Sequence, residues 1–161
     1  MNAARLVLAG ALLSSAVAVY AKPAPHPGAP SAAELVSARQ AAMDLSVSTL
    51  AMLSNASANN VPLKNLAFPA GGLAKWAAVL PSLFSDNTKG TASRAKPTVW
   101  TDRAGFQAKA QVYIDATKAL SAAAAAEDKP AFDSALASTK AACKGCHDTY
   151  QAPPPGAKPA A

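Results

Sequence analysis

The stretch AACKGCHDTYQ, residues 141–151, contains the only two cysteines of the 161-residue sequence. Cys143 and Cys146 stand three residues apart and His147 follows at once, which is the C-x-x-C-H spacing of a c-type haem attachment site. In that chemistry the two thiols add across the haem vinyl groups, and the imidazole binds the iron as an axial ligand. On a helix these three side chains share one face. The stretch therefore predicts one covalently bound haem c, held through two thioethers.

Two other uses of a paired cysteine motif fit the sequence less well. A redox-active C-x-x-C normally opens a helix, where its thiol pKa is lowered, but this motif lies late in an expected helix. A zinc site needs four ligands, and the only other histidine, His26, belongs to a proline-rich segment. Haem attachment remains the favoured interpretation.

The N-terminal residues predict export. Residues 1–21 carry Arg5, then an apolar run, and end in small residues, which is typical of a signal peptide cleaved after Ala21. The apolar run is short for a membrane-spanning helix, so an uncleaved anchor is the less favoured alternative. We expect a periplasmic protein of the Gram-negative type, with no stable membrane insertion after cleavage.

Composition and length limit the function class and the domain count of the chain after residue 21. The net charge is +6 and no basic run interleaved with aromatic residues occurs, so the sequence does not predict nucleic-acid binding. Proline-rich segments at 22–30 and 152–161 flank residues 31–151, which are enough for one domain with a sizeable core.

Within residues 31–151 apolar and small residues recur at spacings of three and four, the pattern of packed helices. The first helix is expected to begin near Ser31 with Glu34 completing a capping box, and the last near Asp128 and Pro130. A polar loop is expected at 85–98. The second helix is expected only after Pro69, Gly71 and Gly72, with a kink at Pro81. The inward positions are Val36, Arg39, Met43, Val47, Leu50 and Leu53; Leu73, Ala77, Leu80 and Phe84; Phe106, Ala110, Tyr113, Thr117, Leu120 and Ala124; and Phe132, Leu136, Thr139, Cys143, Cys146 and Tyr150.

The fold predicted from these faces is all-α, an antiparallel up-and-down four-helix bundle with haem c in the core near one end. A loosely packed pair of Ala-rich helices is the alternative.

The candidates for the second axial ligand of the iron can be narrowed by elimination, because no methionine follows Met52. A methionine ligand must be Met43 or Met52, which point to opposite sides of the first helix. Spacing alone slightly favours Met43 as a core residue, since methionine often fills gaps. Arg39 lies one turn away on the same face, where a cation is costly unless paired. It either meets a haem propionate or extends to the end of the bundle.

Three features together resemble the class II cytochromes c, the cytochrome c-prime family: C-x-x-C-H-x-x-Y on the last of four helices, R-Q-x-x-M at 39–43 on the first, and KPTVWTDRAGF at 96–106. The resemblance covers about residues 31–151. It implies that Arg39 and Gln40 contact the haem propionates. It also implies that Met43 binds the iron, as in the low-spin members. High-spin members carry a residue such as leucine there and leave the iron five-coordinate.

The sequence departs from that family at two places. Gln151 stands where the family usually has arginine or lysine, beside the proximal histidine. The glycines and prolines at 69–81 disturb the second helix, a frequent dimer element, so a homodimer is left open.

These observations predict a periplasmic monohaem electron carrier with His147 and Met43 as axial ligands and with periplasmic or membrane redox proteins as partners. No activated nucleophile or acid–base pair is visible, so an enzyme is not predicted. The alternative is a gas-binding cytochrome that takes NO or CO at an open or displaceable sixth site.

Overall fold

The computed structural model describes residues 28–156. The predicted signal peptide, its cleavage site, most of the proline-rich leader and the end of the tail lie outside these residues.

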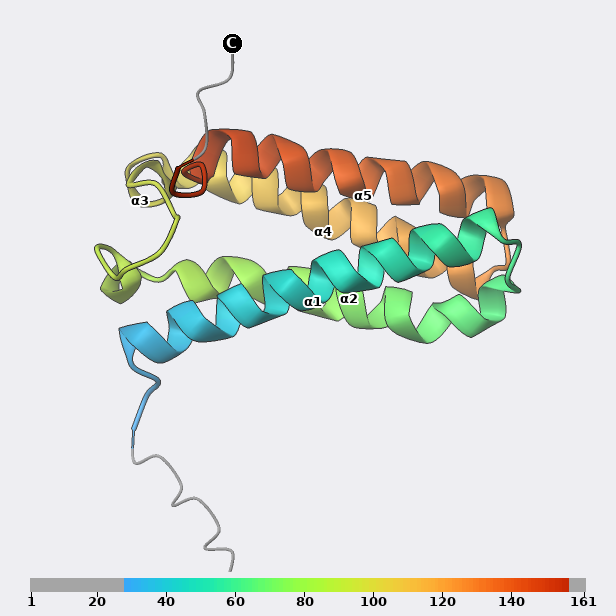
Figure 1. Cartoon of the computed structure of the whole chain (residues 1–161), viewed down its shortest axis with the longest axis horizontal. Helices are drawn as coiled ribbons and strands as arrows, with labels where there is room; N and C mark the ends of the chain where they lie inside the picture. Colours follow the sequence, from blue (N-terminus) through green and yellow to red (C-terminus); the bar gives the residue numbers. More distant parts are fainter. Residues whose placement is uncertain (1–27, 157–161) are drawn as a thin grey trace, which may run out of the picture.

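Four long helices form an antiparallel bundle (Figure 1), which confirms the predicted fold class. Helix α4 packs extensively on α5 and on α2, whereas α1 makes few contacts with α5. Among the described residues the only β-type pairing is an isolated bridge between Ala95 and Gln151. The long helices are α1 (Ala32–Ala58), α2 (Ala67–Val79), α4 (Arg103–Ala125) and α5 (Lys129–Tyr150); the short elements are η1 (Leu63–Leu66), η2 (Leu80–Phe84), η3 (Asp86–Thr88) and α3 (Thr98–Thr101).

The helix starts follow the capping signals in the sequence. The Ser31 hydroxyl accepts from the Glu34 N–H at 3.2 Å, and the Glu34 carboxylate accepts from the Ser31 N–H at 2.7 Å, so the capping box is confirmed. Asp128 caps α5 by accepting from the Ala131 N–H at 3.0 Å, with Pro130 in the first turn.

The predicted start of the second helix was wrong. Helix α2 begins at Ala67, so Pro69, Gly71 and Gly72 lie inside it. Pro69 falls in the first turn, where a backbone N–H needs no partner within the helix. The glycines lower the helix propensity, but burial of the residues on either side outweighs that cost. Pro81 does break the α-helical pattern, because the backbone continues past Val79 as the 3-10 helix η2.

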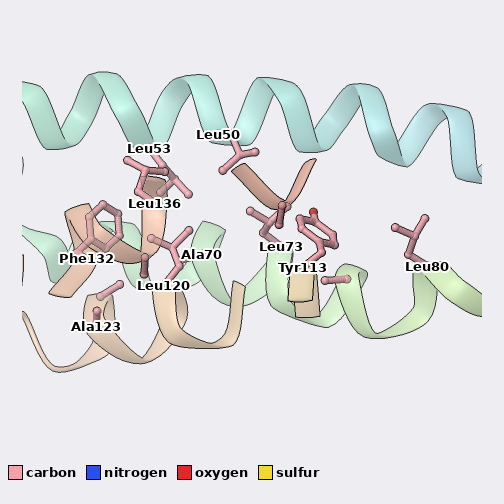
Figure 2. Packing of buried hydrophobic residues seen from close by; sticks show 14 of the residues in the cluster. Leu50, Leu53, Ala70, Leu73, Leu80, Tyr113, Leu120, Ala123, Phe132 and Leu136 are labelled. Carbon is pink, nitrogen blue, oxygen red and sulfur yellow. The ribbon is translucent and has the colours of Figure 1, made fainter. Parts of the chain in front are cut away.

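Most of the predicted inward faces are confirmed, and Figure 2 shows the core that they form. Leu53, Leu120 and Phe132 are completely buried. Val47 is the exception: it is 66% exposed, and Ser46 is buried in its place. Both positions fit a three-four spacing, so the pattern alone did not choose between them.

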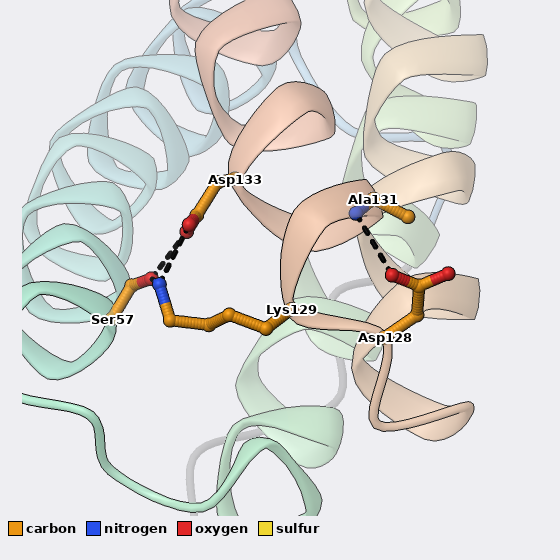
Figure 3. A network of polar contacts seen from close by, with 5 residues as sticks. All are labelled: Ser57, Asp128, Lys129, Ala131 and Asp133. Atoms are coloured by element: carbon orange, nitrogen blue, oxygen red, sulfur yellow. Dashed lines mark hydrogen bonds and ion pairs between the residues drawn. The ribbon is translucent and has the colours of Figure 1, made fainter.

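A polar network closes the end of the bundle where α1 stops and α5 begins (Figure 3). The Lys129 ammonium donates to the Asp133 carboxylate at 2.6 Å and to the Ser57 hydroxyl at 2.9 Å, and Ser57 donates to Asp133. This network joins the two helices at the end remote from the cysteine motif.

One helical stretch, Leu63–Phe84, is long and apolar enough to cross a membrane by length and composition alone. In this fold its residues Ala70, Leu73 and Ala77 are buried against the other helices.

Candidate haem site

A cavity of about 750 Å³ lies between α1 and α5 toward the end of the bundle where α5 terminates. Its volume is within the range typical of cofactor sites. The cavity brings together the residues that the sequence singled out, three from each helix: Arg39, Gln40 and Met43 from α1, and Cys143, Cys146 and His147 from α5.

The cysteine motif occupies the last two turns of α5. Cys143, Cys146 and His147 are half-buried, and neither cysteine forms a disulfide. Burial raises the pKa of both thiols, whereas the thiols of redox C-x-x-C motifs have lowered pKa values. The pKa of His147 is lowered by burial and by the charge of Arg94, which leaves a neutral imidazole, the form that binds metals. The site therefore fits attachment and ligation better than disulfide exchange.

Lys96 caps the C-terminal end of α5. Its backbone N–H donates to the Tyr150 carbonyl at 2.9 Å, and its ammonium donates to the carbonyls of Asp148 and Thr149, both at 3.1 Å. A cation at this place satisfies carbonyls that a helix end leaves free and is favourable to the helix dipole. Only a polar loop was expected here from the sequence, because nothing in it indicates that 94–96 meets residues 148–152.

A second contact holds the same end of α5 against α4. The Tyr150 hydroxyl donates to Asp102 at 2.7 Å, and the other oxygen of that carboxylate accepts from the Gly105 N–H at 3.1 Å. The Tyr150 ring meets the Phe106 ring edge-on, with centroids 5.4 Å apart. Burial and Asp102 raise the pKa of Tyr150 to about 12, so this phenol stays protonated at neutral pH.

Arg39 is buried in the opposite wall, with 3% of its surface exposed. It donates to the Leu83 carbonyl at 3.1 Å and to the hydroxyls of Thr88 (3.3 Å) and Ser93 (3.0 Å), and it lies 4.3 Å over the Phe84 ring. Within residues 28–156 no carboxylate pairs with it, and burial lowers its pKa. Arg39 therefore does not extend into solvent. Its buried positive charge would be paired well by an anionic group in the cavity, such as a haem propionate.

The structure separates the two candidate methionines. Met43 is half-buried and lines the cavity, whereas Met52 is 42% exposed and does not. Gln40 is exposed at the rim, and Gln151 lines the cavity beside the end of α5. Ser46 and Tyr113, two buried cavity residues, were not predicted as site residues, because their spacing is that of ordinary core positions.

Comparison with known proteins assigns the sequence and the fold to a family. The family model described as Cytochrome C' matches residues 34–151. The chain belongs to the cytochrome c' family. Cytochrome c' binds one covalent haem c, which confirms the predicted cofactor.

Individual relatives agree with this assignment. Cytochrome c' of Rubrivivax gelatinosus is 43% identical over 63 residues, which cover 39% of this chain and 49% of the relative. That of Alcaligenes xylosoxydans xylosoxydans is 40% identical over 76 residues, 47% of this chain and 54% of the relative. The chain thus spans about half the length of the curated relatives it matches.

Solved structures match over more of the chain. A ferrous variant of cytochrome c prime from Alcaligenes xylosoxidans with bound NO has a TM-score of 0.71 and 28% identity, covering 78% of this chain and 99% of that one. A carbon-monoxide-bound variant from the same organism has the same TM-score and identity and is covered completely.

The cavity residues fit a covalently held haem. Two half-buried thiols and a neutral imidazole lie on one wall, and a buried cation without a carboxylate partner lies on the other. Residues 28–156 contain no group of three His, Cys, Asp or Glu side chains that would hold a metal ion without a porphyrin.

Proposed function

We propose that this chain is a periplasmic monohaem cytochrome c' that binds NO or CO on the Met43 side of its haem. One observation carries the proposal: the cavity places Met43 and the cysteine motif on facing helices, in a fold whose solved relatives include NO and CO complexes. This favours the gas-binding alternative over the electron carrier that the sequence predicted first.

The residues divide into two groups around the cofactor. Cys143 and Cys146 form the thioethers, and His147 offers its imidazole nitrogen from the same turn of α5. Arg39 and Gln40 face the propionates; Arg39 is already held by three neutral acceptors and keeps its charge uncompensated. When bound, the haem supplies the iron at which a diatomic ligand coordinates.

Met43 decides how open the ligand side is. Its thioether is a neutral side chain in a wall that also carries Arg39, Gln40 and Ser46. It would have to move aside for NO or CO to bind on this side. A flexible methionine can move aside without disturbing the backbone of α1.

The second candidate is an electron carrier with His147 and Met43 as permanent axial ligands. The observation in its favour is that methionine, and not the leucine of high-spin members, lines the cavity at this position. Such ligation raises the reduction potential and leaves no site for gas.

One experiment separates the two candidates. Optical spectra of the mature protein are recorded in both oxidation states, with and without CO, for the wild type and for Met43→Leu. Gas binding predicts that the ferrous wild type takes up CO readily and that Met43→Leu speeds the uptake. The substitution conserves volume, so it costs below about 1.5 kcal/mol of stability.

The result contrary to gas binding is equally clear. A wild type that stays low-spin and excludes CO while Met43→Leu binds it would establish the electron carrier. Export is tested separately, by finding the haem-loaded protein in the periplasmic fraction.

A further inference from the structure

Two hydroxyl side chains lie deep in the wall of the haem cavity. Ser46 of α1 is 7% exposed and Tyr113 of α4 is 6% exposed, and both line the cavity. Figure 2 shows the Tyr113 ring between the helices, with its oxygen directed toward α1 near Leu50. Neither residue was predicted as a functional residue, and the proposed function does not use either.

Burying a hydroxyl is costly unless it is hydrogen-bonded, so the partners of this pair matter. The Ser46 hydroxyl donates its single proton to the Ala42 carbonyl at 2.7 Å. Ser46 also lies close enough to the Tyr113 hydroxyl to interact with it. Its oxygen is free to accept there, because its proton is already given to the Ala42 carbonyl. Burial, chiefly, raises the pKa of Tyr113 to about 12, so the phenol keeps its proton. Within residues 28–156 the polar side chain beside the Tyr113 hydroxyl is therefore a neutral one, and no carboxylate takes its proton.

The other tyrosine in the cavity wall makes a useful contrast. Tyr150 donates to the Asp102 carboxylate at 2.7 Å, and hydrogen bonds to charged acceptors are roughly twice as strong as those between neutral groups. The Tyr150 hydroxyl thus already donates to a charged acceptor, whereas the Tyr113 hydroxyl can still donate to a ligand in the cavity.

Ser46 lies on the Met43 side of the cavity, and Tyr113 of α4 reaches it there while also interacting with Cys143 of α5. Ser46 follows Met43 by three residues on the same face of α1, and Val47 and Leu50 complete that wall. Tyr150 belongs instead to α5, the helix of His147. A ligand that enters beside Met43 thus approaches Val47 and Leu50, and Tyr113 offers it a buried hydroxyl donor.

We propose that Tyr113 donates a hydrogen bond to the diatomic ligand bound on the Met43 side, and that Ser46 orients the phenol before the ligand arrives. The inference rests on the proposed gas-binding function and names the residue that would distinguish bound ligands by their polarity. A donor here favours ligands whose outer atom carries negative charge, because a buried donor left without an acceptor is costly.

The test is the C–O stretching frequency of the ferrous CO complex, recorded in light and heavy water. A hydrogen bond to the outer oxygen strengthens back-donation from the iron and lowers this frequency. We expect Tyr113→Phe to raise the frequency, to abolish its isotope sensitivity and to speed ligand dissociation about threefold to tenfold, the ratio for one net hydrogen bond. Thr139→Val is the control, since it removes a buried hydroxyl of α5 that donates to the Ala135 carbonyl and lies outside the cavity lining, and its frequency stays at the wild-type value.

All variants are also made in a Met43→Leu background, so that ligand entry does not depend on displacement of the thioether. Unchanged frequency and dissociation in Tyr113→Phe, or equal shifts in Tyr113→Phe and Thr139→Val, would overturn the inference and leave gas binding intact. Failure of CO to bind both in the wild-type background and in the Met43→Leu background would overturn the proposed function itself, and with it this inference.

Discussion

Replacement of Gly105 by alanine tests the contact that holds the end of α5 against α4. A Cβ atom built at Gly105 would lie 2.6 Å from the Tyr150 hydroxyl and 2.8 Å from the Asp102 carboxyl carbon, with a closer contact to a carboxylate oxygen. These atoms end short or ring-bound side chains and must move, so both the Tyr150–Asp102 bond and the Asp102 cap of α4 are lost.

The expected cost follows from the interactions broken. A hydrogen bond to a charged group contributes about 2 kcal/mol and a helix cap about 1 kcal/mol. Alanine in place of glycine returns up to about 1 kcal/mol of helix propensity. The net loss is thus about 2 kcal/mol of unfolding free energy, or roughly 6–10 °C in the melting temperature.

Gly72→Ala is the matched control, because Gly72 also lies in a helix and an added Cβ meets nothing within 4 Å. It should stabilise the protein by about 0.5–1 kcal/mol. The assay is thermal and denaturant unfolding of the haem-loaded protein, followed by far-UV circular dichroism. Gly105→Ala should cost less in a Tyr150→Phe background, where one of the colliding atoms is gone. Equal stability of the two alanine variants would refute the argument.

Three further predictions concern the cofactor, the buried cation and the remote polar network. Replacing both Cys143 and Cys146 with serine should give protein whose haem is extracted by acid acetone, whereas the wild-type haem stays with the chain; free extraction from the wild type would contradict the thioethers. Arg39→Met should lower the reduction potential measured in a spectroelectrochemical titration, because a cation in the cavity wall favours the less positive reduced iron. Arg103 lies outside the cavity lining, so Arg103→Met should change the potential little. Equal shifts in the two variants would count against a role for Arg39 at the haem. The pKa of Asp133 is lowered by hydrogen bonds from Lys129 and Ser57, so its contribution to stability is present above its unfolded pKa and disappears as pH falls through the lower folded value. Asp133→Asn should therefore destabilise the protein at neutral pH and lose its effect in acid, as urea unfolding across pH would show, and a pH-independent difference would argue against this linkage.

Local spacing was enough to predict the parts of the site that lie within one helix. Cys143, Cys146 and His147 are fixed relative to one another by helical geometry, and the structure places all three in one cavity wall. Helical spacing likewise put Met43, and not Met52, on the inward face of α1, and Met43 lines the cavity.

Spacing failed where two residues satisfied it equally or where a breaker stood near a helix end. Ser46 and Val47 both fit the inward pattern of α1, and packing against the other helices selected Ser46. Pro69 was taken as a helix break, yet the turn of η1 begins the helix early enough to put it in the first turn of α2.

The sequence by itself determined the covalent chemistry and the fold class, because the haem motif, the capping residues and the three-four spacing depend on neighbours a few residues apart. Only the tertiary structure decided which side chains meet across different helices and loops. Arg39 meets Thr88 and Ser93 across about fifty residues of chain, and Lys96 caps a helix that ends more than fifty residues later. Such partners are chosen by the packing of whole helices, since a buried cation can donate to any acceptor, and a free carbonyl can accept from any donor, that the fold brings within reach.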